Sequence, residues 1–74
     1  MIRYLPFKER LWQDEVGFYD TYGIRALDES GSCVALISDV STDEPTVVAL
    51  CDKCTRGQLA PLHLYDVVED FLGV

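Results

Sequence analysis

The stretch TVVALCDKC, residues 46–54, decides whether the second half of this chain is helical or extended. Four apolar side chains recur at i, i+3, i+4 and i+7, the spacing of one helix face, namely Val47, Leu50, Cys51 and Cys54. The other side of such a helix is mostly polar and carries Ala49, Asp52, Lys53 and Arg56. A strand over residues 46–51 is the alternative, because valine and threonine favour strands. Successive apolar residues would leave that strand without a polar face, so the pattern favours the helix.

The two ends of this helix are signalled with unequal clarity. Ser41 and Glu44 have the spacing of a capping box. Thr42 as the N-cap would instead place Pro45 among backbone positions that need no hydrogen-bond partner. Pro45 also suits the first helical position, so three starts stay open. At the other end, Gly57 is expected to stop the helix in a left-handed conformation.

A second helix is predicted from the apolar spacing between two helix-ending residues. Pro61 suits its first turn, where no backbone N–H is needed. Gly73 suits the left-handed conformation that ends many helices. The apolar stripe of this helix consists of Leu64, Val67, Val68, Phe71 and Leu72. Its outer side carries Tyr65, Asp66, Glu69 and Asp70.

The first half of the chain is rich in aromatic and β-branched residues and is interrupted by turn residues, a pattern typical of strands. Strands are predicted over residues 10–16, 19–27 and 33–40. The third of these segments is apolar on both faces, which predicts a central place in the sheet. The segment before the first strand stays ambiguous, because Pro6 would confine a strand there to a sheet edge or break it.

Strands followed by helices define an α+β protein. We expect a small antiparallel sheet of about two to four strands, followed by two C-terminal helices packed on one face of it. The strands lie within residues 2–40, and the helices lie at about residues 43–56 and 61–72. Residues 1–74 make a single domain, because a chain this short builds only one small core.

Three segments together carry a family resemblance: TYGI at residues 21–24, SDVSTD at 38–43 and HLYDVVEDFL at 63–72. They resemble a family of short, uncharacterised proteins from Gram-positive Firmicutes, one of the domain-of-unknown-function families. The resemblance covers roughly residues 19–72 and is most specific around DVVEDF at 66–71. It implies the two-helix ending and a bacterial cytoplasmic setting. It implies no activity, cofactor or catalytic residue.

Composition excludes several classes of partner. Six Lys and Arg stand against thirteen Asp and Glu, a net charge of −7, which disfavours nucleic acid because phosphate backbones need basic patches. The longest apolar runs, residues 33–37 and 47–51, are far shorter than the roughly 20 residues of a membrane span. Three cysteines are an odd number, and the N-terminus resembles no signal peptide. We therefore expect a cytoplasmic protein with reduced thiols.

The Cys51-Asp52-Lys53-Cys54 motif admits two interpretations. Because both thiols lie on the apolar stripe, burial in the core is the favoured one. The alternative is a zinc site with three thiolates and one imidazole, which would use Cys33, Cys51, Cys54 and His63. Redox chemistry is disfavoured, since the C-terminal end of a helix raises a thiol pKa.

Nothing in the sequence indicates an enzyme. His63 is the only histidine, and it is expected to orient the second helix rather than act as a base. No serine stands in a Gly-x-Ser-x-Gly segment, so no catalytic residue is assigned. No cofactor is expected either.

The acidic outer side of the second helix breaks a local rule. Glu69 and Asp70 make the last turn acidic and oppose the helix dipole, and Asp66 repels Asp70 at i, i+4. No base in the helix offsets these charges, which marks Asp66, Glu69 and Asp70 as a candidate protein-binding face. A solvated face with no binding role is the alternative. Aromatic residues crowd the first third of the chain, and Trp12 and Tyr19 are expected on the sheet face that the helices leave open.

These patterns predict a small acidic cytoplasmic interaction or regulatory module without catalytic activity. We expect an unknown protein partner and a homodimer, since small domains often gain stability by association. Neither a nucleic acid nor a membrane is expected as a partner.

Overall fold

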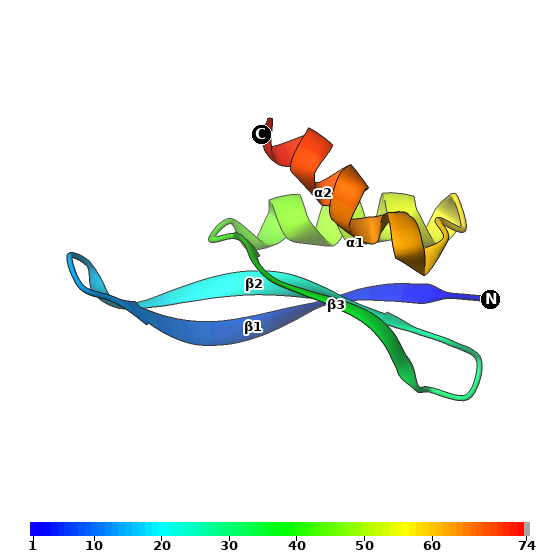
Figure 1. Ribbon diagram of the computed structural model, residues 1–74, viewed down its shortest axis with the longest axis horizontal. Coiled ribbons are helices and arrows are strands. Elements are labelled where there is room, and N and C mark those ends of the chain that lie inside the picture. The colour runs from blue at the N-terminus through cyan, green and yellow to red at the C-terminus, as the bar shows by residue number, and fades with distance from the viewer. Residues whose placement is uncertain (74) are drawn as a thin grey trace.

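The computed structural model describes residues 1–73 and confirms the α+β arrangement (Figure 1). Three strands form one antiparallel sheet in the order β1-β2-β3, with bounds Arg3–Gln13, Gly17–Leu27 and Cys33–Ser41. They are followed by α1 (Glu44–Arg56), a short 3-10 turn η1 (Pro61–His63) and α2 (Leu64–Leu72). Both helices lie on the same face of the sheet, α1 against β1 and β2 and α2 against β3.

The first strand is longer and begins earlier than the sequence indicated. β1 and β2 pair along their whole length, from Arg3 with Leu27 to Gln13 with Gly17. Residues 14–16 form the turn, so the predicted strand over residues 10–16 is wrong at its C-terminal end. Gly17 has φ 83°, a conformation that glycine adopts without strain and that starts the return strand. Pro6 is tolerated because β1 is an edge strand.

The predicted central place of the third strand is wrong. β2 is central and β3 forms the second edge, because two successive hairpins set each strand beside the one before it. β3 is apolar on both faces for another reason. One face packs on the helices, and the other carries Val34 and Leu36, which stay exposed.

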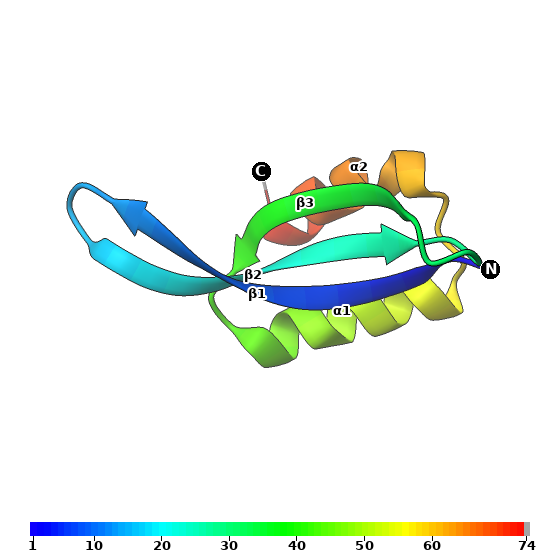
Figure 2. The same ribbon diagram turned by 90° about the horizontal axis from the view of Figure 1, so that it is seen from below.

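The far ends of β1 and β2 project beyond the rest of the molecule. β3 pairs with β2 only as far as Tyr22, which faces Ser41. Residues 10–20, named here the hairpin arm, therefore pair only with each other, and the helices do not cover them (Figures 1 and 2). A two-stranded ribbon of this kind is at best marginally stable in water on its own.

Helix α1 begins at none of the three positions that the sequence left open. Asp43 is the N-cap, and its carboxylate accepts hydrogen bonds from the backbone N–H and the side-chain hydroxyl of Thr46. A carboxylate here satisfies a free N–H and also faces the positive end of the helix dipole. At the other end, Gly57 has φ −81°, and the left-handed residue is Gln58 with φ 48°. The expected left-handed Gly57 is therefore wrong.

The second helical segment starts with a tighter turn than expected. Pro61 opens η1, and the regular helix begins at Leu64. Gly73 has φ 77°, which confirms the left-handed end. Leu64 and Val68 of the predicted stripe are buried, whereas Phe71 is 46% exposed.

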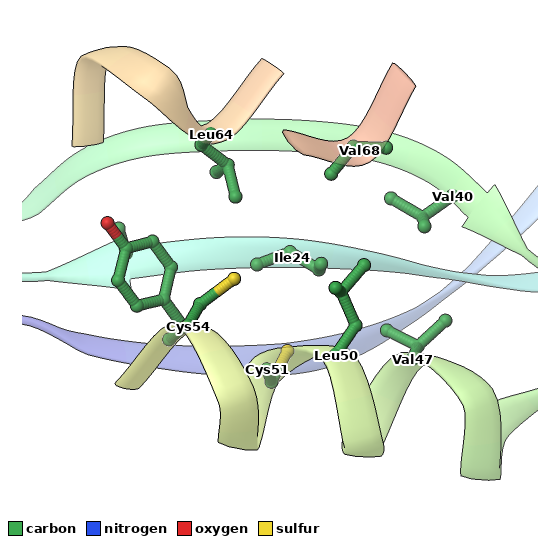
Figure 3. Packing of buried hydrophobic residues seen from close by; sticks show 10 residues of the cluster. Ile24, Val40, Val47, Leu50, Cys51, Cys54, Leu64 and Val68 are labelled. Carbon is green, nitrogen blue, oxygen red and sulfur yellow. The ribbon is translucent and has the colours of Figure 1, made fainter. Parts of the chain in front are cut away.

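The core lies between the sheet and the two helices (Figure 3). Its buried apolar residues are Tyr4, Ile24, Ala26, Val40, Val47, Leu50, Cys51, Cys54, Leu64 and Val68. The predicted stripe of α1 is thus confirmed in full. The start of β1 is tied to the end of α1 by polar contacts as well, since the backbone N–H of Tyr4 donates to Thr55 Oγ1 (2.9 Å) and its hydroxyl donates to the Leu59 carbonyl.

Candidate functional site

The face of the sheet opposite the helices has no second layer over it within residues 1–73 (Figures 1 and 2). Register places alternate residues of each strand on that side. We call it the open face, and its apolar side chains are Leu5 and Phe7 of β1, Leu27 of β2, and Val34 and Leu36 of β3. Leu36 is 63% exposed and Val34 is 45% exposed. The three strands thus present an apolar strip to solvent, which Arg25 interrupts between Leu5 and Leu36.

Phe7 lies over the central strand because its neighbour there has no side chain. Phe7 pairs with Gly23, and a Cβ at Gly23 would stand 2.5 Å from Phe7 Cζ and 2.5 Å from the Ile37 carbonyl oxygen. The strands therefore require glycine at this point for close approach rather than for a special φ. The ring fills the place of the missing side chain and is itself only half-buried.

A polar cluster lies beside this apolar strip, where β3 leaves the sheet. Ser38, Asp39 and Val40 together oppose the single residue Gly23, which makes a bulge. Asp39 sits in the bulge with φ 53°. The Glu9 carboxylate reaches across from β1 and accepts from Asp39 N (2.8 Å) and Ser38 Oγ (2.6 Å).

Two side chains of β2 hold the Asp39 carboxylate from the other side. Thr21 is fully buried, and its hydroxyl lies 2.7 Å from Asp39 Oδ1 and 3.1 Å from the Ser41 carbonyl oxygen. The Tyr19 hydroxyl donates to Asp39 Oδ2 (3.0 Å), and this bond raises the pKa of Tyr19, because an ionised phenolate has no proton to donate to Asp39. These bonds fix the corner that leads to Asp43 and α1. The TYGI and SDVSTD segments meet here.

The aromatic residues of the hairpin arm lie on both of its faces. Trp12 pairs with Phe18, and they are 59% and 65% exposed. Arg10 stacks on the Phe18 ring at 5.0 Å from its centroid. Tyr19 follows Phe18 directly in β2, so the two side chains point to opposite faces of the arm. Because Trp12 shares a face with Phe18, Trp12 and Tyr19 do not share one. The expectation that both lie on the open face is wrong for Trp12, which is uncovered because the helices end before the arm.

The three acidic residues of α2 are all exposed, as their pattern indicated. Within residues 1–73 none of them forms an ion pair. Asp70 lines a hollow between α1 and α2, whereas Glu69 lines a hollow on the β3 side of α2. The structure therefore separates two carboxylates that the sequence grouped on one face.

The four residues of the alternative zinc site are not brought together. Cys51 and Cys54 are buried in the core (Figure 3). Cys33 is exposed at the start of β3, and His63 is exposed on η1. Among residues 1–73, no group of three or more His, Cys, Asp or Glu side chains is placed to hold a metal ion. Burial raises the pKa of Cys51 to about 12 and also raises that of Cys54, which opposes formation of the thiolate that a metal needs.

The open face contains residues that the sequence patterns did not select. Arg3 and Arg25 lie on it beside Leu5, and neither forms an ion pair within the described part of the chain. Leu36 is its most exposed aliphatic residue. The sequence feature that indicates this face is the strand over residues 33–40, which has apolar residues on both of its sides. That pattern alone predicts a central strand and not an exposed edge strand.

Fold and surface together define a small two-layer α+β protein with one uncovered sheet face. The chain belongs to a family described as "Family of unknown function (DUF6514)", whose model matches residues 2–74. No curated protein and no solved structure matches the chain. No helix among the described residues is long and apolar enough to cross a membrane.

Proposed function

We propose that this protein is a small acidic interaction module that forms a homodimer through its open face and hairpin arm. The observation that carries this proposal is the apolar strip over three strands of a sheet covered on one side only. Exposed apolar strips of this kind mark interaction surfaces. The arm extends this face with Leu11 and Tyr19, whereas Trp12 and Phe18 are exposed on its other side.

The distribution of charge on the open face supports a second copy as the partner. Arg3 and Arg25 lie toward one end, and Glu9 and Asp39 lie toward the other. A two-fold axis through the face would set the basic end of one copy against the acidic end of its partner. Such self-complementarity is what an isologous dimer requires. Cover from a second copy would also give the arm the packing that an isolated ribbon lacks.

We further propose a bacterial cytoplasmic setting, a Firmicutes origin and no catalytic activity. The resemblance supports the first two, and three free thiols, one of them exposed, fit a cytoplasmic protein. His63 is exposed, and no serine of the chain lies in a Gly-x-Ser-x-Gly segment. Both observations fit a binding role better than a catalytic one. The net charge of −7 favours protein over nucleic acid as the partner.

Light scattering or sedimentation equilibrium over a micromolar concentration series tests the dimer. We expect a mass approaching twice 8.3 kDa. Leu36→Glu places a charge on the most exposed aliphatic side chain of the open face and should dissociate the dimer, and Leu11→Glu should do the same from the arm. Leu62→Glu is the matched control, because Leu62 is 77% exposed on η1, away from the open face. A mass near 8.3 kDa throughout would refute the dimer.

A further inference from the structure

A groove runs between the two helices on the side of the molecule away from the sheet. Figure 1 shows α2 diverging from α1, and the space between them is a hollow of about 460 Å³. An adjoining hollow of about 450 Å³ shares Leu50, Lys53 and Phe71 with the first. The two make one groove along α1, from Thr46 to Gly57.

The floor and walls of this interhelical groove are mainly apolar. Its apolar lining consists of Ala49, Leu50, Cys54, Leu59, Val67 and Phe71. Phe71 is 46% exposed, so a large part of its ring remains in contact with water. From Thr46 to Gly57 the groove is about 16 Å long at 1.5 Å per residue, which corresponds to about three turns of helix. An apolar groove of that length fits one face of a short amphipathic helix.

Charge differs between the two walls. On the α2 wall, Asp70 lines the groove, and Asp66 lies one turn before it on the same side of the helix. Neither has an ion-pair partner within residues 1–73. On the α1 wall, Arg56 is paired with Asp52 at 2.8 Å. Lys53 of α1 lines both hollows and also has no ion pair within residues 1–73, so the unpaired charges at the rim are the Lys53 ammonium on α1 and the two carboxylates on α2.

We propose that the interhelical groove binds an amphipathic helix of a partner protein, with lysine or arginine beside its apolar stripe where it faces α2. Basic side chains there would pair with Asp66 and Asp70, and the apolar stripe would cover Phe71 and Val67. The net charge of −7 attracts such a segment and accelerates its association. This binding site is separate from the open face and does not depend on self-association.

A designed peptide tests the groove directly. The probe is a fluorescein-labelled helix of about 15 residues, with leucine at i, i+3, i+4 and i+7 and lysine on one flank. A control peptide has the same composition in an order that removes the leucine stripe. We expect fluorescence anisotropy to show saturable binding of the first peptide only. In ¹H–¹⁵N spectra of the unmodified full-length protein, shifts should concentrate at Ala49, Lys53 and Phe71.

Two charge reversals on the same helix separate the groove from general attraction. Asp70→Lys should weaken binding of the probe about five- to tenfold, because it replaces an attraction at the rim with a repulsion. Glu69→Lys changes net charge equally but lies on the β3 side of α2, so its effect should stay within about twofold. Phe71→Ser should weaken binding further, with circular dichroism to confirm that the variant folds.

Three results would overturn the proposal. Equal weakening by both reversals would mean unspecific attraction of a cation to an acidic protein. Amide shifts confined to the open face would place the peptide elsewhere. A change of oligomeric mass in Phe71→Ser, with unchanged mass in Leu36→Glu, would make a second copy the occupant of the groove.

Discussion

Replacement of Gly23 by alanine tests the close approach of strands at the centre of the sheet. The added Cβ would stand 2.5 Å from the Ile37 carbonyl oxygen and 2.5 Å from Phe7 Cζ. Both distances are about 1 Å shorter than an optimal contact of about 3.5 Å. The Phe7 ring is half-buried at the open face and can turn away. The Ile37 carbonyl is backbone next to the bulge, so relief there requires β2 and β3 to separate locally.

The expected loss follows from two opposing terms. Overpacking of this kind costs about 1–3 kcal/mol. Alanine restricts the unfolded chain more than glycine, which returns about 0.4–1 kcal/mol. The difference between the two terms is a loss of about 0–2.6 kcal/mol. Because relief at the Ile37 carbonyl requires backbone movement, we expect the free energy of unfolding to fall by about 1–2 kcal/mol, which for a chain of this length lowers Tm by roughly 4–16 °C. Thermal and urea unfolding, followed by circular dichroism at one low protein concentration, measure this change.

Gly57→Ala is the matched control for that substitution. Gly57 has φ −81°, and its Cβ would meet only the Lys53 carbonyl oxygen, at 3.2 Å. The free energy of unfolding of the Gly57→Ala variant should equal that of the unmodified protein or exceed it slightly. The variant Phe7→Ala/Gly23→Ala isolates the contribution of the ring, and the contact with Ile37 should remain costly in the Phe7→Ala background. Unchanged or increased stability of Gly23→Ala would refute the reasoning.

Two further predictions concern the buried groups. Cys33 should react rapidly with a thiol reagent at pH 8, whereas Cys51 and Cys54 should react only in denaturant, since burial raises the pKa of Cys51 to about 12; fast native labelling of all three cysteines would contradict burial. Thr21→Val should lower the free energy of unfolding by about 1–2 kcal/mol in urea titrations, because the Asp39 carboxylate and the Ser41 carbonyl lose a buried hydroxyl partner. An equal loss in an Asp39→Gly background would show that the contact between Thr21 and Asp39 contributes nothing.

The open face and the interhelical groove are two separate candidate binding surfaces on the same small chain. The core is one layer of side chains between the sheet and the helices. Nothing within residues 1–73 covers the opposite side of the sheet, where Phe7 occupies the space above Gly23. A partner on the open face would therefore complete the packing of the sheet. A helix in the groove would cover Phe71 instead, so the two surfaces can be tested by separate variants.

The amino-acid sequence by itself determined the parts of this protein that depend on near neighbours in the chain. The repeat of Val47, Leu50, Cys51 and Cys54 specified α1 and its buried face, because side chains three and four residues apart share one side of a helix. Gly73 marked the end of α2 for an equally local reason, its freedom to adopt φ 77°. The exposed carboxylates of α2 followed from the same spacing.

Only the tertiary structure decided what depends on residues far apart in the chain. The pairing register made β2 central, left the hairpin arm without a third strand and set Trp12 and Tyr19 on opposite faces. Asp43 is the N-cap of α1, four residues after the bulge residue Asp39 with its φ of 53°. The placement of Cys33 away from Cys51 and Cys54 was decided in the same way. Strand pairing joins segments through contacts that no local periodicity specifies, so the face left open could be identified only after the strands were placed.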